Sequence, residues 1–363
     1  MGFKCGIVGL PNVGKSTLFN SLTEDSIAAE NYPFCTIEPN SGVVVVPDSR
    51  LDVVARLANS DKVVPAVVKF TDIAGLVEGA ADGQGLGNKF LSHIRETDAI
   101  IHVVRAFYDE NVTHVSGKLD PCHDIDIINT ELALSDLESC TKALEKAKKN
   151  SKSGDKSSLK RAQNLELMVD SLSQGLDLRS KNIDESIKIL SKEFGLLSSK
   201  PVLYVANVDE KSLKGNALSK LIKEYAEKNQ TKFVQISASL ESELRTLTKN
   251  ERNEYLDGLG VSGSGFEILV KAGYRLLNLQ SFFTGGPKEA RAWTIPVGVK
   301  APSAAAAIHG DFERGFIKAD VISFSDYEKY GGENGAKQSG KMRSEGKDYF
   351  VNDGDVIHFK FNV

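Results

Sequence analysis

A chain of 363 residues is long enough for two or three domains, and its 41% hydrophobic and 26% charged residues are ordinary for a globular protein. A formal net charge of −4 excludes a uniformly basic nucleic-acid-binding surface, so any such contact must be local. Cys5, Cys35, Cys122 and Cys140 show no paired spacing, so we expect reduced thiols. The sequence shows no secretory leader and no apolar run near the roughly 20 residues that span a bilayer. We therefore expect a cytoplasmic protein with no membrane partner.

The first predicted elements are a strand at residues 3–8 and a helix that begins at residues 17–22. Between them, residues 9–16 (GLPNVGKS) match the phosphate-binding pattern G-x-x-x-x-G-K-[ST]. Such a loop turns backbone N–H groups toward a triphosphate at the positive end of the helix. Lys15 is placed to reach the β- and γ-phosphates, and the Ser16 hydroxyl to ligate Mg²⁺. The candidate nucleotide-binding residues of this loop are Asn12, Val13, Gly14, Lys15, Ser16 and Thr17.

Two later segments supply the contacts expected of a nucleotide-dependent switch. Thr36, in the loop after the first helix, is the predicted second protein ligand of Mg²⁺. Asp72 ends the predicted strand at residues 67–72 and can hold Mg²⁺ through a water molecule. Gly75, three residues later, can donate its backbone N–H to the γ-phosphate.

Apolar runs alternate with helical stretches over the first 120 residues, which predicts an α/β fold with a parallel sheet and crossover helices. The predicted strands are residues 3–8, 43–46, 67–72, 99–104, 201–206 and 233–236. The nucleotide-binding domain is accordingly assigned to residues 1–124 and 198–278.

Residues 125–197 contain no convincing strand and carry apolar residues at helical spacing, which predicts an antiparallel helical hairpin inserted in the nucleotide-binding domain. Its tip is basic, with Lys146, Lys148, Lys149, Lys152, Lys156, Lys160 and Arg161. This tip is either a solvated helix face or a surface that contacts phosphate backbones.

The composition changes near Leu279, and residues 279–363 are predicted to form a compact α+β domain. Strand-like segments lie at residues 293–299, 321–324, 349–351 and 356–361, and a short helix follows residues 304–307. A second basic patch contains Lys337, Lys341, Arg343 and Lys347. Few aromatic residues lie between these basic side chains, which favours recognition of structured or double-stranded RNA by shape and charge.

The predicted base-binding loops follow two later strands. One is Asn207, Val208, Asp209 and Glu210, where a GTPase has Asn-Lys-x-Asp, and the other contains Ser237 and Ala238. A guanine site needs a short carboxylate for the N1–H and the exocyclic amine, and a Lys over the ring. Glu210 is one methylene longer and Val208 has no charge, so guanine preference is weakened. An adenine site requires Glu210 to be turned away from the base.

Together, residues 9–16, 32–40 (YPFCTIEPN), 72–77 (DIAGLV), 83–88 (GQGLGN) and 207–210 (NVDE) resemble the YchF group of Obg-related P-loop NTPases. The helical insertion and a C-terminal segment similar to a TGS domain, which has a β-grasp-like fold, extend the resemblance over essentially the whole chain. It implies a Ras-like, Obg-type nucleotide-binding domain that hydrolyses ATP, uses GTP more weakly, and associates with the ribosome (70S or large subunit). Asn12 stands where related proteins that use K⁺ have an asparagine. We expect a monomer.

The residue that positions the attacking water is not obvious from the sequence. A Ras-like enzyme has a Gln directly after the Asp-x-x-Gly element, whereas this chain has Leu76. We therefore expect slow intrinsic hydrolysis supported by Lys15 and Gly75, with His114 or Glu78 as the candidate water-positioning group.

Three alternatives to a ribosome-associated ATPase switch stay open. The first is a GTP-binding switch that binds structured RNA and turns over very slowly. The second is a metabolic kinase, although the switch-like pattern of Thr36 and Asp72 suits nucleotide sensing better. The third is a nucleotide-gated scaffold with negligible turnover, which Leu76 would permit.

Overall fold

The computed structural model divides into two compact units, residues 1–42 with 69–269 and residues 43–68 with 270–363. The residues that the structure describes are 3–23, 40–73, 86–109, 119–151, 155–175, 178–179, 183–261 and 263–362.

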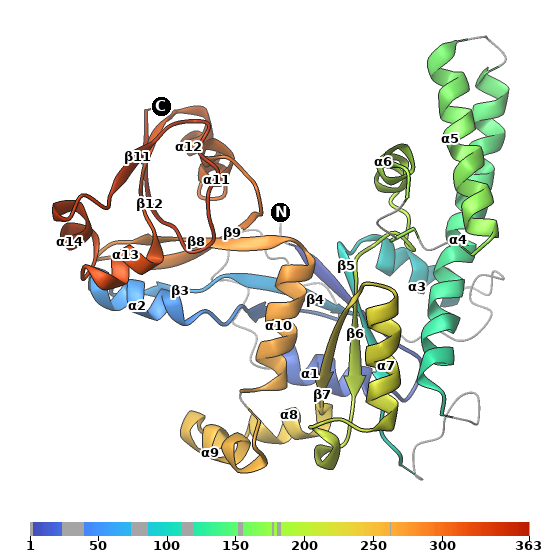
Figure 1. The fold of residues 1–363 in the computed structure, drawn as a ribbon, viewed down its shortest axis with the longest axis horizontal. Coiled ribbons are helices and arrows are strands. Elements are labelled where there is room, and N and C mark those ends of the chain that lie inside the picture. The colour runs from blue at the N-terminus through green and yellow to red at the C-terminus, as the bar shows by residue number, and fades with distance from the viewer. Residues whose placement is uncertain are drawn as a thin grey trace. The chain divides into compact units, whose positions relative to one another are not determined.

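A parallel sheet is the centre of the first unit (Figure 1). Its strands are β1 (Lys4–Val8), β2 (Ser41–Val45), β4 (Val67–Asp72), β5 (Ala99–Arg105), β6 (Val202–Asn207) and β7 (Lys232–Ile236), of which β2 and β4 cross the sequence boundaries between the two units. They lie in the order β2-β4-β1-β5-β6-β7, and the pairs β4/β1, β1/β5, β5/β6 and β6/β7 are parallel. The bounds agree with the predicted strands to within two residues, and the predicted α/β fold class is confirmed.

The sheet brings residues from four separate segments to one edge. Every residue of β5 and β6 is buried, as expected for central parallel strands that are covered on both faces. Because parallel strands share a direction, their carboxyl ends meet at the same edge of the sheet. The loop after β1, Asp72 at the end of β4, Asn207 at the end of β6 and Ser237 after β7 therefore lie along this edge.

Within the described residues, further elements connect or cover the strands. They are α1 (Lys15–Thr23), α3 (Leu86–Arg95), the 3₁₀ helix η4 (Glu210–Ser212), α7 (Ala217–Lys228), α8 (Ala238–Leu244), α9 (Lys249–Leu259) and α10 (Gly265–Leu276). α7 packs on β6 and β7, and it starts at a capping box in which Asn216 and Ser219 satisfy each other's backbone N–H groups. α10 runs across the sequence boundary between the two units.

The predicted helical hairpin is confirmed. α4 (Pro121–Asn150) and α5 (Lys156–Ser173) lie side by side, and α6 (Glu185–Glu193) packs on α5 (Figure 1). Their buried interface includes Cys140, Leu144, Leu165, Met168 and Leu172. Across the ranges that the structure describes, no helix is both long and apolar enough to cross a membrane.

The base of the hairpin is fixed by a buried carboxylate in α4. Asp136 is fully buried and accepts hydrogen bonds from the backbone N–H groups of Leu197 (2.9 Å) and Ser198 (2.7 Å) and from the Ser198 hydroxyl (2.6 Å). Burial raises the pKa of Asp136, and these three donors act against that rise. The carboxylate thus joins α4 to the segment that leads into β6.

The second unit contains a mixed sheet with short helices. Its strands are β3 (Val63–Val64), β8 (Leu279–Gly285), β9 (Ala290–Pro296), β10 (Phe316–Ile322), β11 (Arg343–Glu345) and β12 (Val356–Phe361), in the order β11-β10-β12-β8-β9-β3. Its helices are α2 (Ser49–Ala58), α11 (Ala301–Ala306), α12 (Gly310–Arg314), α13 (Phe324–Lys329) and α14 (Glu333–Gln338). Phe282, Ala304, Ala319, Ile357 and Phe359 lie in its hydrophobic core.

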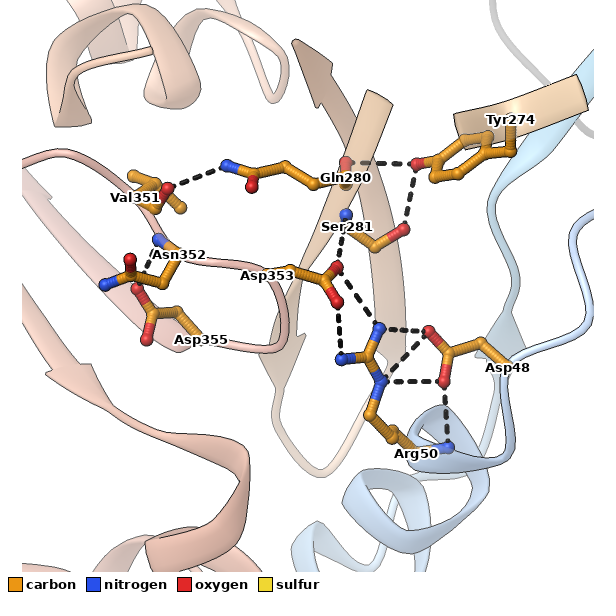
Figure 2. Close-up of polar contacts among 9 residues, drawn as sticks. All are labelled: Asp48, Arg50, Tyr274, Gln280, Ser281, Val351, Asn352, Asp353 and Asp355. Atoms are coloured by element: carbon orange, nitrogen blue, oxygen red, sulfur yellow. Dashed lines mark hydrogen bonds and ion pairs between the residues drawn. The ribbon is translucent and has the colours of Figure 1, made fainter. Parts of the chain in front are cut away.

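Residues 43–68 are tied to the C-terminal strands by backbone pairing and by an ion pair. β3 pairs with β9, and α2 packs on β8 and β9. Figure 2 shows the Arg50 guanidinium between two carboxylates, 2.7 Å from Asp48 and 2.8 Å from Asp353. Asp353 also accepts a hydrogen bond from the backbone N–H of Ser281 at 3.0 Å. An early segment of the sequence is thereby part of the C-terminal unit.

Two of the predicted C-terminal strands are wrong in detail. Residues 349–351 form no strand, because Phe350 makes only an isolated bridge to Lys300. Phe324 begins α13 instead of extending β10, because the Ser323 hydroxyl caps this helix by accepting a hydrogen bond from the Asp326 N–H.

Candidate nucleotide-binding site

The P-loop joins β1 to α1 through a backbone that requires glycine at two positions. Gly14 has φ 89°, and a Cβ there would lie 2.2 Å from Nδ2 of Asn207. A Cβ on Gly9 would lie 2.6 Å from the carbonyl oxygen of Val103. Asn12, with φ 64°, also adopts the left-handed conformation. The loop is therefore tightly packed against the ends of its neighbouring strands.

Lys15 and Ser16, in the first turn of α1, converge on Asp72. The buried Lys15 ammonium lies 2.8 Å from Oδ1 of Asp72, and the Ser16 hydroxyl lies 3.4 Å from Oδ2. Thr17 follows on the exposed side of the same turn. A lysine, a hydroxyl and a carboxylate in this arrangement can bind a phosphate group and a cation together.

The oxygen donors of Ser16 and Asp72 fit Mg²⁺. This ion is usually held by one or two protein oxygens together with substrate phosphates and water. Among the described residues there is no group of three or more His, Cys, Asp or Glu side chains that could hold a metal by themselves. A metal at Ser16 and Asp72 would accordingly be held jointly with a nucleotide.

The Asn207 side chain connects the P-loop to both base-binding loops. Its Nδ2 donates to the carbonyl oxygen of Val13 at 2.9 Å, and its Oδ1 accepts from the backbone N–H of Ala238 at 3.0 Å. The Val208 side chain is buried, and its backbone N–H donates to Ile236. The Ser237 hydroxyl caps α8. The structure thus brings Val13, Gly14, Asn207, Val208, Ser237 and Ala238 together at one edge of the sheet.

Glu210 begins η4 and makes a contact that the sequence did not reveal. Its Oε1 accepts a hydrogen bond from the hydroxyl of Tyr255 in α9 at 2.8 Å. This hydrogen bond raises the pKa of Tyr255. Beside it, Oδ1 of Asp209 is buried and has no hydrogen-bond partner among the residues described. No motif spacing relates Tyr255 to a residue 45 positions earlier, so sequence reasoning had no signal for this pair.

Five residues proposed from the sequence lie outside the described residues: Thr36, Gly75, Leu76, Glu78 and His114. The second Mg²⁺ ligand, the backbone donor to the γ-phosphate and the water-positioning group therefore stay predictions. Lys15, Ser16 and Asp72 are the phosphate- and metal-binding candidates whose geometry is defined.

The basic hairpin tip is partly neutralised by acidic neighbours. Lys148 pairs with Glu166, and Arg161 pairs with Glu193. Lys146, Lys149 and Lys156 are exposed and make no ion pair within the described residues, and Lys152 lies outside them. In the C-terminal patch, Arg343 lies 3.6 Å from Glu345 and donates to the hydroxyl of Tyr349 at 3.0 Å.

Family models match both ends of the chain. The model described as a 50S ribosome-binding GTPase matches residues 4–132, and the model of the C-terminal domain of YchF GTPases, described as a protein of unknown function, matches residues 279–362. Proteins named "Ribosome-binding ATPase YchF" are similar over the full length of both chains. Identity is 53% for the relative from Haemophilus ducreyi, 51% for that from Escherichia coli O157:H7 and 50% for that from Bacillus subtilis.

Solved structures agree with this similarity. The YchF GTPase of Schizosaccharomyces pombe is 36% identical and superposes with a TM-score of 0.88, covering 99% of this chain and 98% of that chain. A GTP-binding protein from Pyrococcus horikoshii OT3 superposes with a TM-score of 0.61 at 19% identity, covering 99% and 100%, which shows a shared fold.

Proposed function

Since the chain belongs to the YchF family, as its full-length similarity to YchF proteins shows, we propose that it is a nucleoside triphosphatase that hydrolyses Mg·ATP and acts as a nucleotide-dependent switch on the ribosome. The observation that carries the proposal is the convergence of Lys15 and Ser16 on Asp72. These groups belong to elements 57 positions apart in the sequence and lie where Asn207 joins the P-loop to the base-binding loops.

The groups with a defined geometry, and the residues expected from the sequence alone, each have a chemical role in this proposal. When a nucleotide binds, the Lys15 ammonium exchanges its ion pair with Asp72 for contacts with the β- and γ-phosphates. There it stabilises the negative charge that develops during phosphoryl transfer. Ser16 and Thr36 would be the protein ligands of Mg²⁺, and Asp72 would hold the ion through water; the bound ion would neutralise charge on the phosphates. Gly75 donates to the γ-phosphate, and His114 or Glu78 orients the attacking water. Because Leu76 cannot hydrogen-bond water, intrinsic turnover is slow until a partner reorganises the site.

ATP is the proposed substrate, and GTP a weaker one, because the base-binding loop has lost two guanine-recognition features. Val208 is buried and uncharged, so it cannot place a cation over the ring. Glu210 is already hydrogen-bonded to Tyr255. The test is titration calorimetry with Mg·ATP and Mg·GTP on the intact chain. Lys15→Ala should weaken binding of both nucleotides at least tenfold, on the scale of lost charge-assisted hydrogen bonds. Lys220→Ala, an exposed lysine of α7, is the control and should change neither.

Turnover distinguishes the ATPase from the alternatives. Phosphate release from ATP that rises when ribosomes are added supports an activated ATPase. Nucleotide binding with no phosphate release in either condition would support a scaffold, and phosphate transfer to a small-molecule acceptor would reveal a kinase. A comparison of KCl with NaCl in the same assay tests the proposed K⁺ dependence through Asn12.

We further propose that a monomer reaches the ribosome, or structured RNA, through the exposed lysines of the hairpin tip and the C-terminal basic patch. The triple variant Lys146→Glu, Lys149→Glu, Lys156→Glu should weaken ribosome retention and reduce its dependence on salt concentration. The control triple variant Lys220→Glu, Lys223→Glu, Lys228→Glu on α7 carries the same change in net charge. Equal retention of the two variants across a salt series would remove the hairpin tip from the interface.

A further inference from the structure

Tyr255 of α9 contacts Glu210 of the base-binding loop, and this contact affects whether the site prefers ATP or GTP. The Tyr255 hydroxyl donates to Oε1 of Glu210 at 2.8 Å, and Tyr255 lies in α9, 45 positions after Glu210. A carboxylate at this position recognises guanine by accepting two hydrogen bonds, one from N1–H and one from the exocyclic amine, and so needs both of its oxygens to face the base. Each oxygen can accept more than one hydrogen bond, so the Tyr255 hydroxyl acts by fixing the direction in which the Glu210 carboxylate faces.

The tyrosine is held in place by the packing of α9. Leu256, the next residue, is buried with Leu240 and Leu244 of α8. Leu213, which follows η4, packs against the same cluster. At its start, α9 is capped by Thr248 and Glu251, whose side chains each satisfy the other's backbone N–H. α9 therefore packs against the segments that directly follow the two base-binding loops, and the position of the Tyr255 hydroxyl relative to Glu210 is set by a helix rather than by a loop.

We propose that Tyr255 is a positioning residue that holds the Glu210 carboxylate out of the two-oxygen guanine contact, and thereby favours adenine over guanine. The extra methylene of Glu relative to Asp gives the carboxylate its reach toward α9. Adenine presents an unprotonated N1 to the same part of the site, and a carboxylate free to approach N1 would repel it. Engaging Oε1 with a hydroxyl thus weakens GTP binding and relieves ATP binding with a single hydrogen bond. This inference rests on the proposed nucleotide-binding function.

The test is the ratio of the Kd values for Mg·GTP and Mg·ATP, measured by calorimetry on the intact chain. Tyr255→Phe removes only the hydroxyl from a ring that is 42% exposed, so the variant should fold. Its ratio should shift toward GTP on the order of tenfold, the size expected for a hydrogen bond to a charged group. The matched control is Tyr225→Phe, since the hydroxyl of Tyr225 in α7 donates to the carboxylate of Asp126 in α4 at 2.7 Å. The ratio of this variant should stay at the wild-type value.

A second pair of variants separates positioning from a general structural role. In a Glu210→Ala background, adding Tyr255→Phe should leave the ratio unchanged, because no carboxylate remains to be held. A shift of less than twofold for Tyr255→Phe in the wild-type background, or an equal shift in the Glu210→Ala background, would overturn the inference. Failure of the wild-type chain to bind either nucleotide would instead overturn the proposed function.

Discussion

The side-chain amide of Asn207 donates to the carbonyl oxygen of Val13, 194 positions earlier, at a distance of 2.9 Å. The same amide accepts from Ala238 through its oxygen. One buried side chain therefore fixes the position of the P-loop relative to a base-binding loop. The phosphate-binding and base-binding parts of the site both depend on the hydrogen bonds of Asn207. This arrangement implies that Asn207 acts on any bound nucleotide, whichever purine it carries.

Asn207→Asp should weaken ATP and GTP binding by similar factors. The substitution keeps an acceptor for Ala238 but replaces the donor to Val13 by a carboxylate oxygen that the carbonyl repels. We expect the free energy of unfolding to fall by about 1–3 kcal/mol, the cost of a buried group left without its partner. Calorimetry and urea unfolding measure the two effects.

Asn229→Asp is the control for this prediction. The Asn229 amide donates to the Tyr225 carbonyl oxygen at 2.9 Å, at the end of α7 and away from the P-loop. Nucleotide affinity should not change in this variant. A change in purine preference with Asn207→Asp would contradict a shared support and would indicate direct base reading by Asn207.

Arg50→Lys should lower the stability of the second unit. The guanidinium reaches Asp48 and Asp353 at once, across 303 positions of sequence, which a single ammonium cannot reproduce. Because the Arg50 side chain is 29% exposed, we expect only about 1–2 kcal/mol less free energy of unfolding. Hydrogen exchange should also accelerate at the Ser281 N–H, which donates to Asp353.

Lys142→Ala is the control for the arginine. Lys142 pairs with Glu138 on the exposed face of α4, where ion pairs contribute little to stability. Slow exchange at Ser281 that persists in Arg50→Lys would show that backbone pairing alone ties residues 43–68 to the C-terminal strands.

Asp136→Asn should destabilise the base of the helical hairpin. Three donors from Leu197 and Ser198 surround this fully buried carboxylate, and an amide would turn one N–H₂ group toward them. We expect a loss of about 1–3 kcal/mol in the free energy of unfolding. The exposed Asp126→Asn, which disturbs one hydrogen bond from Tyr225, should have a smaller effect. Equal losses for the two variants would mean that Asp136 has no special role in joining α4 to β6.

Elements that are specified by a few consecutive residues could be predicted from the sequence. The strand predicted at residues 201–206 matches β6 to within one residue, because a central parallel strand that is covered on both faces reads as a continuous apolar run, here residues 202–206. The phosphate-binding loop was equally clear, because its glycines, lysine and serine are required within eight consecutive residues. Asp72 was expected beside this loop because it ends the strand at residues 67–72 and begins an Asp-x-x-Gly element, in the order along the chain that is typical of nucleotide-dependent switches.

Relationships between distant segments could not be predicted in this way. Residues 63–64 pair with β9 although nothing in their own sequence specifies that partner. Tyr255 is an ordinary exposed helical residue until α9 is packed beside Glu210. The predicted strand at residues 349–351 failed because aromatic and branched residues suit both a strand and a loop with a single bridge, and only the register of the sheet decides between them.

His102 should make the stability of the protein fall as the pH is lowered. It lies in β5, is 1% exposed, and its ring centroid is 5.5 Å from that of Tyr204. Burial, together with the nearby positive charge of Arg179, lowers the pKa of His102 to about 3 from its ordinary value of 6.5. The neutral imidazole is therefore the form that the folded protein accepts.

The sign of the effect follows from proton binding. Above pH 6.5 the imidazole is neutral in both the folded and the unfolded chain, so His102 adds no pH dependence. Between about pH 6.5 and pH 3 the unfolded chain binds a proton that the folded chain does not, so the free energy of unfolding falls as pH decreases, by up to about 1.4 kcal/mol per pH unit. Below about pH 3 this loss is complete.

The measurement is the difference between the wild-type and His102→Gln unfolding free energies from pH 7.5 to pH 4.5, in which contributions from unchanged carboxylates cancel. Lowering the pH should move this difference in favour of the variant, because glutamine does not titrate. A difference for His102→Gln that stays constant over this range would mean that water or a structural change accommodates the protonated imidazole in the folded chain.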